Sequence, residues 1–223
     1  MTGIVVAGGR VQPEFLLQIL EKEKKQEENL WLLAVDGGLA VLQRAGLCPQ
    51  EIVGDFDTVS PEVLAYYQGV PDIVWQRHRP EKDATDTELA LEEAKRRGCE
   101  RVLLLGATGG RLDHELSNIQ LLNLYADASM KVEILDEKNR ITLLAASTEP
   151  RRRFCKSEQY GHYISFVPLS EKVRGITLRG FQYPLTDRDI TIGSSLCISN
   201  ELTEEEGSLQ FCEGTLLCIE SKD

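Results

Sequence analysis

Two aspartates that follow a short apolar run are the residues of this chain best suited to chemistry. Ile52 and Val53 lead into Gly54, and Asp55 and Asp57 come next with one residue between them. The pattern predicts a buried strand that ends in a loop, and residues i and i+2 there point the same way. Because crowded carboxylates repel, a hard divalent cation with oxygen ligands would stabilise them. We therefore predict that both bind a metal; the alternative is a turn in which Asp57 caps a helix.

A second acidic cluster lies farther along the chain. Asp83 and Asp86 stand three residues apart and flank Thr85. This spacing at a helix start would place both carboxylates on one face. On this stretch alone the favoured interpretation is plain helix capping, because Thr and Asp are common capping residues. Beside a bound metal and triphosphate, Lys82 would be a phosphate ligand.

The most informative loop surrounds the paired glycines Gly109 and Gly110. A strand pattern enters this loop and a helix pattern leaves it, so free backbone N–H groups and a helix N-terminus would face a ligand. The glycines let the backbone approach that ligand closely, and Arg111 offers a planar fork for phosphate. The alternative is a glycine-rich turn with Asp113 as a helix cap and His114 as a structural or solvated histidine.

The elements that must position these loops alternate between strand and helix patterns up to about residue 130. Such alternation predicts an α/β domain with a mostly parallel sheet and helices on both faces. Ligands of such sheets lie beyond the carboxyl ends of the strands. Several glycine or aspartate loops directly follow a predicted strand, so we expect them to share one edge of the sheet. These loops cover residues 8–9, 36–38, 54–57 and 106–110.

The pattern changes in the last third of the chain. Short apolar or alternating runs are separated by glycine, proline and charged turns, with no helical period. This predicts a small all-β domain, an antiparallel sandwich or half-barrel. We expect an α/β domain over residues 1–147, a linker around the arginines of residues 149–156, and a β-sandwich over 153–223. The expected sandwich strands cover residues 163–167, 173–178, 195–199, 209–212 and 216–219.

Composition excludes several classes of protein. The 223 residues carry a net charge of −11, which argues against nucleic-acid binding through a broad basic surface. No apolar run approaches the ~20 residues of a membrane span, and Met1 to Gly3 lead straight into a strand pattern without a signal peptide. The six cysteines include no CxxC pair. We expect a reduced, cytoplasmic protein with structural cysteines.

Taken together, five motifs resemble those of the thiamine pyrophosphokinase family. Their order and spacing match that family, and the resemblance covers nearly the whole chain. The motifs are Asp36-Gly37-Gly38, Gly54-Asp55-Phe56-Asp57, Lys82-Asp83-Ala84-Thr85-Asp86, the run from Thr108 to His114, and Ile198-Ser199-Asn200.

The resemblance implies transfer of a pyrophosphoryl group from ATP to the hydroxyl of thiamine with Mg²⁺, giving thiamine diphosphate and AMP. It also implies a catalytic α/β domain, a thiamine-binding β-sandwich, and a homodimer with active sites between subunits. Carried over by position, four aspartates surround the metal and phosphates: Asp55, Asp57 and Asp83 as metal ligands, and Asp86. The residues expected on the substrate and nucleotide side are Asp36, Gly37, Gly38, Lys82, Thr85, Thr108, Gly109, Gly110, Arg111, Asp113 and His114, with Ser199 and Asn200 facing thiamine.

One departure concerns how thiamine is held. Animal members of the family carry a late tryptophan that stacks on thiamine, whereas this chain has only Trp31 and Trp75, both in its first half. Phe211 is the nearest aromatic residue late in the chain that could take the place of this tryptophan.

Two other functions remain open from the residues themselves. The run from Asp55 to Val59 is close to the D-x-D-x-T/V motif of haloacid dehalogenase-type phosphatases, although two strand–helix units precede it and no later G-D-x-x-x-D-like site follows. A Mg²⁺-dependent phosphatase would release inorganic phosphate. The second alternative is a nucleotide-binding regulatory protein whose sandwich recognises a partner, which would bind ligands without turnover.

Overall fold

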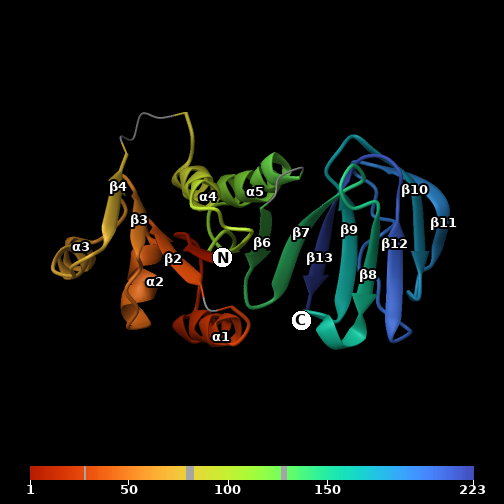
Figure 1. The fold of residues 1–223 in the computed structure, drawn as a ribbon. Helices are drawn as coiled ribbons and strands as arrows, with labels where there is room; N and C mark the ends of the chain where they lie inside the picture. The colour runs from red at the N-terminus through yellow and green to blue at the C-terminus, as the bar shows by residue number, and fades with distance from the viewer. Residues whose placement is uncertain (28, 79–82, 127–129) are drawn as a thin grey trace. The chain divides into compact units, whose positions relative to one another are not determined.

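The computed structural model of the chain describes residues 1–27, 29–78, 83–126 and 130–223 (Figure 1). The chain divides into two compact units. The first comprises Met1–Leu121 with Ser129–Glu137, and the second comprises Leu122–Ala128 with Lys138–Asp223. Each unit is described by itself.

The first unit is built on a parallel sheet whose strands run in the order β4-β3-β2-β1-β5-β6. The chain moves outward from β1 to β4 and then crosses to β5 on the other side of β1. The carboxyl ends of β1 and β5 therefore form the topological switch point, where ligands of such sheets bind. The strands are β1 (Thr2–Val6), β2 (Leu30–Val35), β3 (Glu51–Gly54), β4 (Val74–Arg77), β5 (Arg101–Leu105) and β6 (Lys131–Leu135).

Helices lie on both faces of this sheet, α1 and α2 on one face and α4 and α5 on the other (Figure 1). Right-handed crossovers require this, because the direction of strand addition reverses after β4. Local signals set two helix starts: the Ser60 hydroxyl caps α3, and the Thr85 hydroxyl caps α4. The helices are α1 (Pro13–Lys24), α2 (Gly38–Arg44), α3 (Pro61–Gln68), α4 (Asp86–Arg96) and α5 (Leu112–Leu121).

The second unit contains two antiparallel arrays, β7-β13-β9 and β11-β10-β12-β8. Their inner faces share an apolar core in which Phe154, Phe166 and Phe181 meet edge to face at centroid distances of 5.6–5.9 Å. The elements are the short η1 (Leu122–Tyr125), β7 (Asn139–Ala145), β8 (Arg151–Cys155), the short η2 (Lys156–Glu158), β9 (Tyr163–Pro168), β10 (Lys172–Arg179), β11 (Leu185–Thr191), β12 (Glu206–Gln210) and β13 (Thr215–Ser221).

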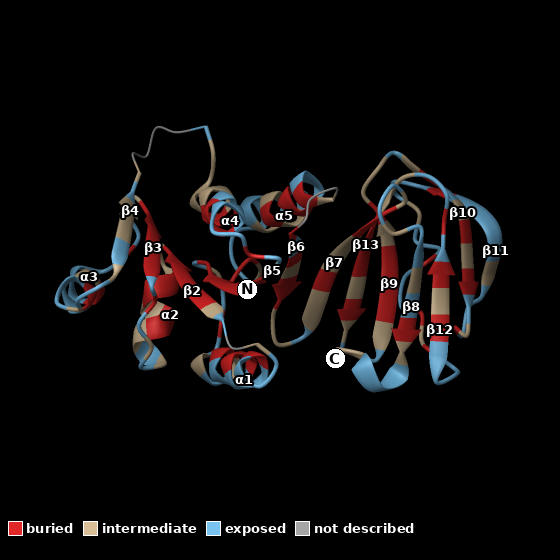
Figure 2. Cartoon of the chain, viewed as in Figure 1, coloured by how far each residue is buried: buried red, intermediate tan, exposed pale blue. Residues whose placement is uncertain are grey.

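The fold confirms the predicted class, an α/β unit with a mostly parallel sheet followed by an all-β sandwich. Figure 2 shows that buried residues run along strands such as β2 and β3 in the first unit and β13 in the second. Two local expectations are wrong. The arginine run over residues 151–155 is strand β8 and not a linker, and residues 195–199 form turns and not a strand.

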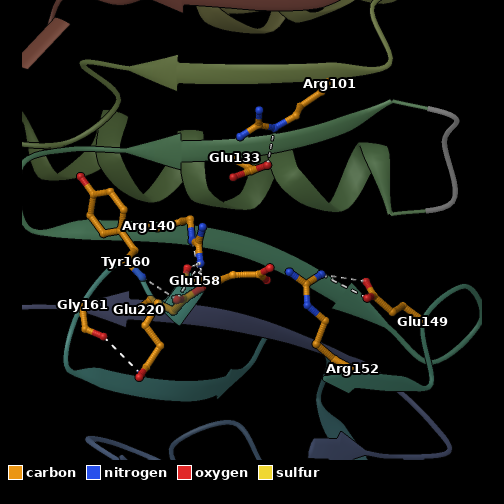
Figure 3. Close-up of polar contacts among 10 residues, drawn as sticks. Arg101, Glu133, Arg140, Glu149, Arg152, Glu158, Tyr160, Gly161 and Glu220 are labelled. Carbon is orange, nitrogen blue, oxygen red and sulfur yellow. Dashed lines mark hydrogen bonds and ion pairs between the residues drawn. The ribbon is translucent and has the colours of Figure 1, made fainter. Parts of the chain in front are cut away.

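Ion pairs are built into the second unit (Figure 3). Glu220 is 3% exposed, and its carboxylate accepts N–H groups from the Arg140 guanidinium at 2.6–2.9 Å and from the Tyr160 backbone at 3.0 Å. Arg140 also donates to the Glu158 carbonyl oxygen at 3.1 Å. A buried charge is tolerated when it is paired and hydrogen-bonded in this way.

In the part of the chain that the structure describes, no helix is long and apolar enough to cross a membrane.

Candidate active site

A cleft of 710 Å³ opens at the carboxyl edge of the first unit's sheet. The loops after β1, β2, β3 and β5 line it, together with the first turns of α4 and α5. It therefore brings together the strand-end loops that the sequence placed at one edge. Among its lining residues are Gly8, Asp36, Asp55, Asp57, Asp86 and Arg111.

The loop after β3 carries two of the lining carboxylates, Asp55 and Asp57. The Asp57 N–H donates to Asp55 Oδ1 at 3.1 Å, which turns the chain back on itself. Phe56 between them has φ of 67°, a left-handed conformation that few non-glycine residues adopt. Both aspartates reach the same cleft, as their i, i+2 spacing predicted.

The loop after β2 contributes Asp36 and Gly37 to the cleft lining. Asp36 Oδ1 accepts the Phe56 N–H at 3.2 Å, so this carboxylate touches the neighbouring loop. Gly38 is buried as the first residue of α2 and does not line the cleft. A Cβ at Gly38 would lie 2.0 Å from the Val6 carbonyl oxygen, so this glycine permits a close backbone approach.

The second acidic cluster is divided by the start of α4. Thr85 Oγ1 accepts the Glu88 N–H at 3.2 Å, so Thr85 is a helix cap and also lines the cleft. Asp86 lines the cleft, whereas Asp83 is exposed and is not among the lining residues. Lys82 lies outside the described residues.

The glycine-rich loop after β5 is held from both ends. The Thr108 hydroxyl donates to Asp136 Oδ2 at 2.7 Å, and the Gly110 N–H donates to Glu115 Oε1 at 2.6 Å. Gly109 has φ of 76°, where a side chain would be strained. Thr108 and Gly110 line the cleft, and Gly109 supplies the turn between them.

The residue just before α5 places a cation at the cleft. Arg111 donates to Asp113 at 2.6 and 3.2 Å, and this contact lowers the pKa of the Asp113 carboxyl. Arg111 and His114 line the cleft, whereas Asp113 is exposed outside it. Because α5 begins at Leu112, Asp113 lies in the first turn and not at the cap. An exposed pair of this kind is weakly held, so the guanidinium can turn to another anion.

Sequence reasoning missed two lining residues of α5, Glu115 and Asn118. Asn118 is 6% exposed, and its Nδ2 donates to the Ala107 carbonyl oxygen at 3.0 Å, which ties the glycine-rich loop to the helix. The available signal was helical spacing, since residues four positions apart share a face. Glu115 follows Arg111 by four positions, and Asn118 follows His114 by four.

Ser199 and Asn200 belong to the second unit and differ in exposure. Ser199 is exposed, with φ of 53°, and its N–H donates to Ser165 Oγ at 2.9 Å. Asn200 is 1% exposed, and its amide bonds to both backbone groups of Tyr183. The Asn200 side chain therefore serves the structure around Tyr183.

The late aromatics of the second unit also differ. Phe211 is 1% exposed and packs in the sandwich core. It is therefore not available for stacking on a ligand. Tyr183 is 58% exposed, in the turn between β10 and β11.

Comparison with known proteins decides the family. Models of the thiamin pyrophosphokinase catalytic domain and vitamin B1 binding domain match residues 23–134 and 153–216. The thiamine pyrophosphokinase of Bacillus subtilis (strain 168) is 37% identical over 219 residues, which cover 98% of each chain. The chain belongs to the thiamine pyrophosphokinase family.

Solved structures of thiamine pyrophosphokinases agree with this assignment. The crystal structure of the Bacillus subtilis protein matches with a TM-score of 0.85 and 35% identity, covering 100% of both chains. That of Geobacillus thermodenitrificans thiamin pyrophosphokinase matches with a TM-score of 0.84 and 38% identity, covering 100% of this chain and 98% of the other. Membership of the thiamine pyrophosphokinase family makes the chain a diphosphotransferase, as predicted, and favours neither the phosphatase nor the regulatory alternative.

Proposed function

We propose that this chain transfers the pyrophosphoryl group of ATP to the hydroxyl of thiamine with the help of Mg²⁺, giving thiamine diphosphate and AMP. The observation that carries this proposal is the cleft at the switch point of the sheet. Carboxylates and a glycine-rich loop that leads into a helix N-terminus line it together. A triphosphate needs cations around its oxygens, and carboxylates would hold such a cation. It also needs N–H donors, which the glycine-rich loop and the helix N-terminus would supply.

The donor set of the cleft suits Mg²⁺. Asp55 and Asp57 offer hard carboxylate oxygens from one loop. Bound Mg²⁺ would neutralise phosphate charge and orient the in-line displacement. Over the described residues no three His, Cys, Asp or Glu side chains already form a metal-binding group, so phosphate oxygens and water would complete the shell. Asp83 remains the third ligand predicted from the sequence, although it is not among the lining residues of the cleft.

The glycine-rich side of the cleft would hold the nucleotide phosphates. Gly8 and Gly110 line the cleft without side chains, so a phosphate could approach the backbone there, and the N-terminus of α5 favours negative charge. Arg111 would exchange Asp113 for a phosphate, because its pair with Asp113 is exposed. His114 would add a second donor from the same helical turn.

The transfer needs a proton acceptor for the thiamine hydroxyl, because a primary alcohol is a poor nucleophile. We assign this role to Asp86, which lines the cleft. Asp83 is the other acceptor that the sequence predicted. The pyrophosphoryl group then forms its bond to the thiamine oxygen as its bond to the AMP phosphate breaks.

The second unit would supply the contacts to thiamine. Ser199 is exposed and offers a hydroxyl, and Tyr183 offers an exposed ring. The thiazolium of thiamine is a permanent cation, and cations bind to aromatic faces. Tyr183 would thus supply the aromatic contact that the buried Phe211 cannot, and the Asn200 amide would fix the Tyr183 backbone through two hydrogen bonds.

We further propose that the protein works as a cytoplasmic homodimer. Leu112 and Leu116 of α5 are 68% and 51% exposed and stand one helical turn apart, next to lining residues of the cleft. Exposed leucines in such a row are typical of a surface that another chain covers. Light scattering after size-exclusion chromatography would give twice the mass of 25.0 kDa.

The function is tested by incubating the protein with ATP, Mg²⁺ and thiamine and following nucleotides by chromatography. We expect AMP to form only when thiamine is present. Inorganic phosphate without AMP would favour a phosphatase, and ligand binding without products would favour a regulatory protein. Asp55→Asn and Asp57→Asn should each abolish most turnover; near-normal turnover of both at saturating Mg²⁺ would refute the metal assignment.

A further inference from the structure

Asp36 joins the ends of two neighbouring strands, β2 and β3. Its backbone N–H donates to the Val53 carbonyl oxygen at 3.2 Å. Its carboxylate Oδ1 accepts the Phe56 N–H, also at 3.2 Å. The side chain therefore holds the centre of the loop that carries Asp55 and Asp57.

That loop has a conformation that must be held in place. Phe56 has φ of 67°, and the left-handed region costs a non-glycine residue about 1–2 kcal/mol. Its ring is 6% exposed and meets Trp75 edge to face at 5.4 Å, with the Arg77 guanidinium at 5.7 Å from its centroid. Phe56 is thus fixed at two points, by Asp36 at its backbone N–H and by Trp75 at its ring.

Gly54 makes room for the Asp36 carboxylate. A Cβ at Gly54 would lie 1.8 Å from Asp36 Oδ1 and 2.6 Å from its Cγ. Real Cβ atoms do not approach other atoms so closely, so any side chain here would displace Asp36 from the loop. Gly54 and Asp36 therefore form a matched pair, in which the missing side chain of one admits the carboxylate of the other.

We propose that Asp36 is a positioning residue, which fixes the directions of Asp55 and Asp57 through the Phe56 N–H. The sequence placed it among the nucleotide contacts. The proposal rests on the metal role of Asp55 and Asp57 in the proposed function. Its physical basis is that groups which orient metal ligands by hydrogen bonds typically change metal affinity about 10–100-fold when removed.

Substitution by asparagine separates positioning from direct charge. Asp36→Asn keeps an Oδ1 acceptor for Phe56, removes the negative charge, and suits the left-handed conformation of residue 36, whose φ is 41°. Asp36→Ala removes both acceptor and charge. Gly54→Ala keeps Asp36 but displaces its carboxylate, and it also strains the backbone of residue 54, whose φ is 155°. A positioning role therefore predicts that Gly54→Ala resembles Asp36→Ala and that Asp36→Asn stays near the wild-type protein.

The test measures Mn²⁺ binding by electron paramagnetic resonance, in the absence and presence of ATP, and needs no turnover. We expect Asp36→Ala and Gly54→Ala to weaken Mn²⁺ binding at least about tenfold and Asp36→Asn less than about threefold. Equal weakening in Asp36→Asn and Asp36→Ala would overturn the proposal and favour direct contact by the charge. Wild-type affinity in both Asp36→Ala and Gly54→Ala would overturn it as well.

The Mn²⁺-binding test remains decisive in three further cases. If Asp36→Ala fails to fold, as judged by circular dichroism, Asp36→Gly removes the same acceptor and charge at a residue whose φ of 41° suits glycine, and its comparison with Asp36→Asn carries the test. The wild-type protein could form no AMP yet bind Mn²⁺, with the variants weakening Mn²⁺ binding in the expected order. In that case the proposed reaction fails while the positioning role stands. If the wild-type protein binds no Mn²⁺ even with ATP, the positioning role is refuted.

Discussion

The side-chain amide of Asn200 holds Tyr183 by both of its backbone groups. Nδ2 donates to the Tyr183 carbonyl oxygen at 2.9 Å, and Oδ1 accepts the Tyr183 N–H at 3.0 Å. The same Oδ1 accepts the Glu201 N–H at 3.0 Å. Asn200 is 1% exposed and Tyr183 is 58% exposed, so a buried amide presents an aromatic ring at the surface.

Tyr183→Ala should raise the KM for thiamine between about 2-fold and 30-fold, because a cation–π contact contributes ~0.5–2 kcal/mol. Tyr183→Phe is the control and should change this KM little, since the ring and not the hydroxyl makes the contact. Steady-state kinetics with varied thiamine measures both. An unchanged KM in Tyr183→Ala, or an equal rise in the KM for ATP, would contradict the assignment.

Asn200→Ala should lower the free energy of unfolding by about 1–3 kcal/mol, because it removes three hydrogen bonds of the Asn200 amide, two to the Tyr183 backbone and one to the Glu201 N–H. It should also raise the KM for thiamine. The neighbouring change Ser199→Ala should raise that KM with little loss of stability, because Ser199 is exposed and donates only its backbone N–H in a bond that alanine retains. Urea denaturation combined with kinetics separates the two. A rise in the KM for thiamine without loss of stability in Asn200→Ala would show that Asn200 contacts the ligand directly.

The sequence predicted which loops meet at the cleft better than it predicted the contacts within it. The strand-end loops could be predicted to meet because parallel strands bring their carboxyl ends to one edge. The partners of Asp36 and Asn200 could not be predicted, since these bonds span 20 and 17 residues of chain. Asp83 and Asp86 looked equivalent by spacing, yet α4 begins at Asp86 and only Asp86 of the two lines the cleft.

The all-β unit shows where pattern analysis fails. Strand β8 carries Arg151, Arg152 and Arg153, which resembled a charged linker. Ladder bonds to β12 define this strand, and Phe154 is its buried residue. Strand β11 was missed because Ile190 is its only buried residue, so apolar alternation is absent. Hydrogen bonding to neighbouring strands determines whether such segments form strands, and the local sequence pattern does not predict that pairing.

Glu220→Ala should destabilise the protein by about 3–5 kcal/mol, because it leaves the Arg140 charge without its partner in a largely buried site. The matched control is Glu213→Ala. Glu213 pairs with Arg174, and the two side chains are 62% and 53% exposed, so its loss should cost less than about 1 kcal/mol. Thermal and urea unfolding measure both variants. Equal effects would show that burial of the Glu220 pair adds nothing.

Cysteine reactivity should follow burial. Burial raises the pKa of Cys218 to about 12 and that of Cys197 to about 11, so at pH 8 both stay protonated and unreactive, since the thiolate is the nucleophile. Cys48 and Cys212 are exposed and should react with a disulfide reagent within minutes. Mass spectrometry of the labelled native protein locates the adducts, and labelling in urea is the control. Native labelling of Cys218 would contradict the described packing.

The central claim is transfer of an intact pyrophosphoryl group to thiamine. ATP labelled in its γ-phosphate, given to the protein with Mg²⁺ and thiamine, tests it most directly. The account predicts that the label appears in thiamine diphosphate and that AMP forms in equal amount. Label in inorganic phosphate, or ADP together with thiamine monophosphate, would contradict it.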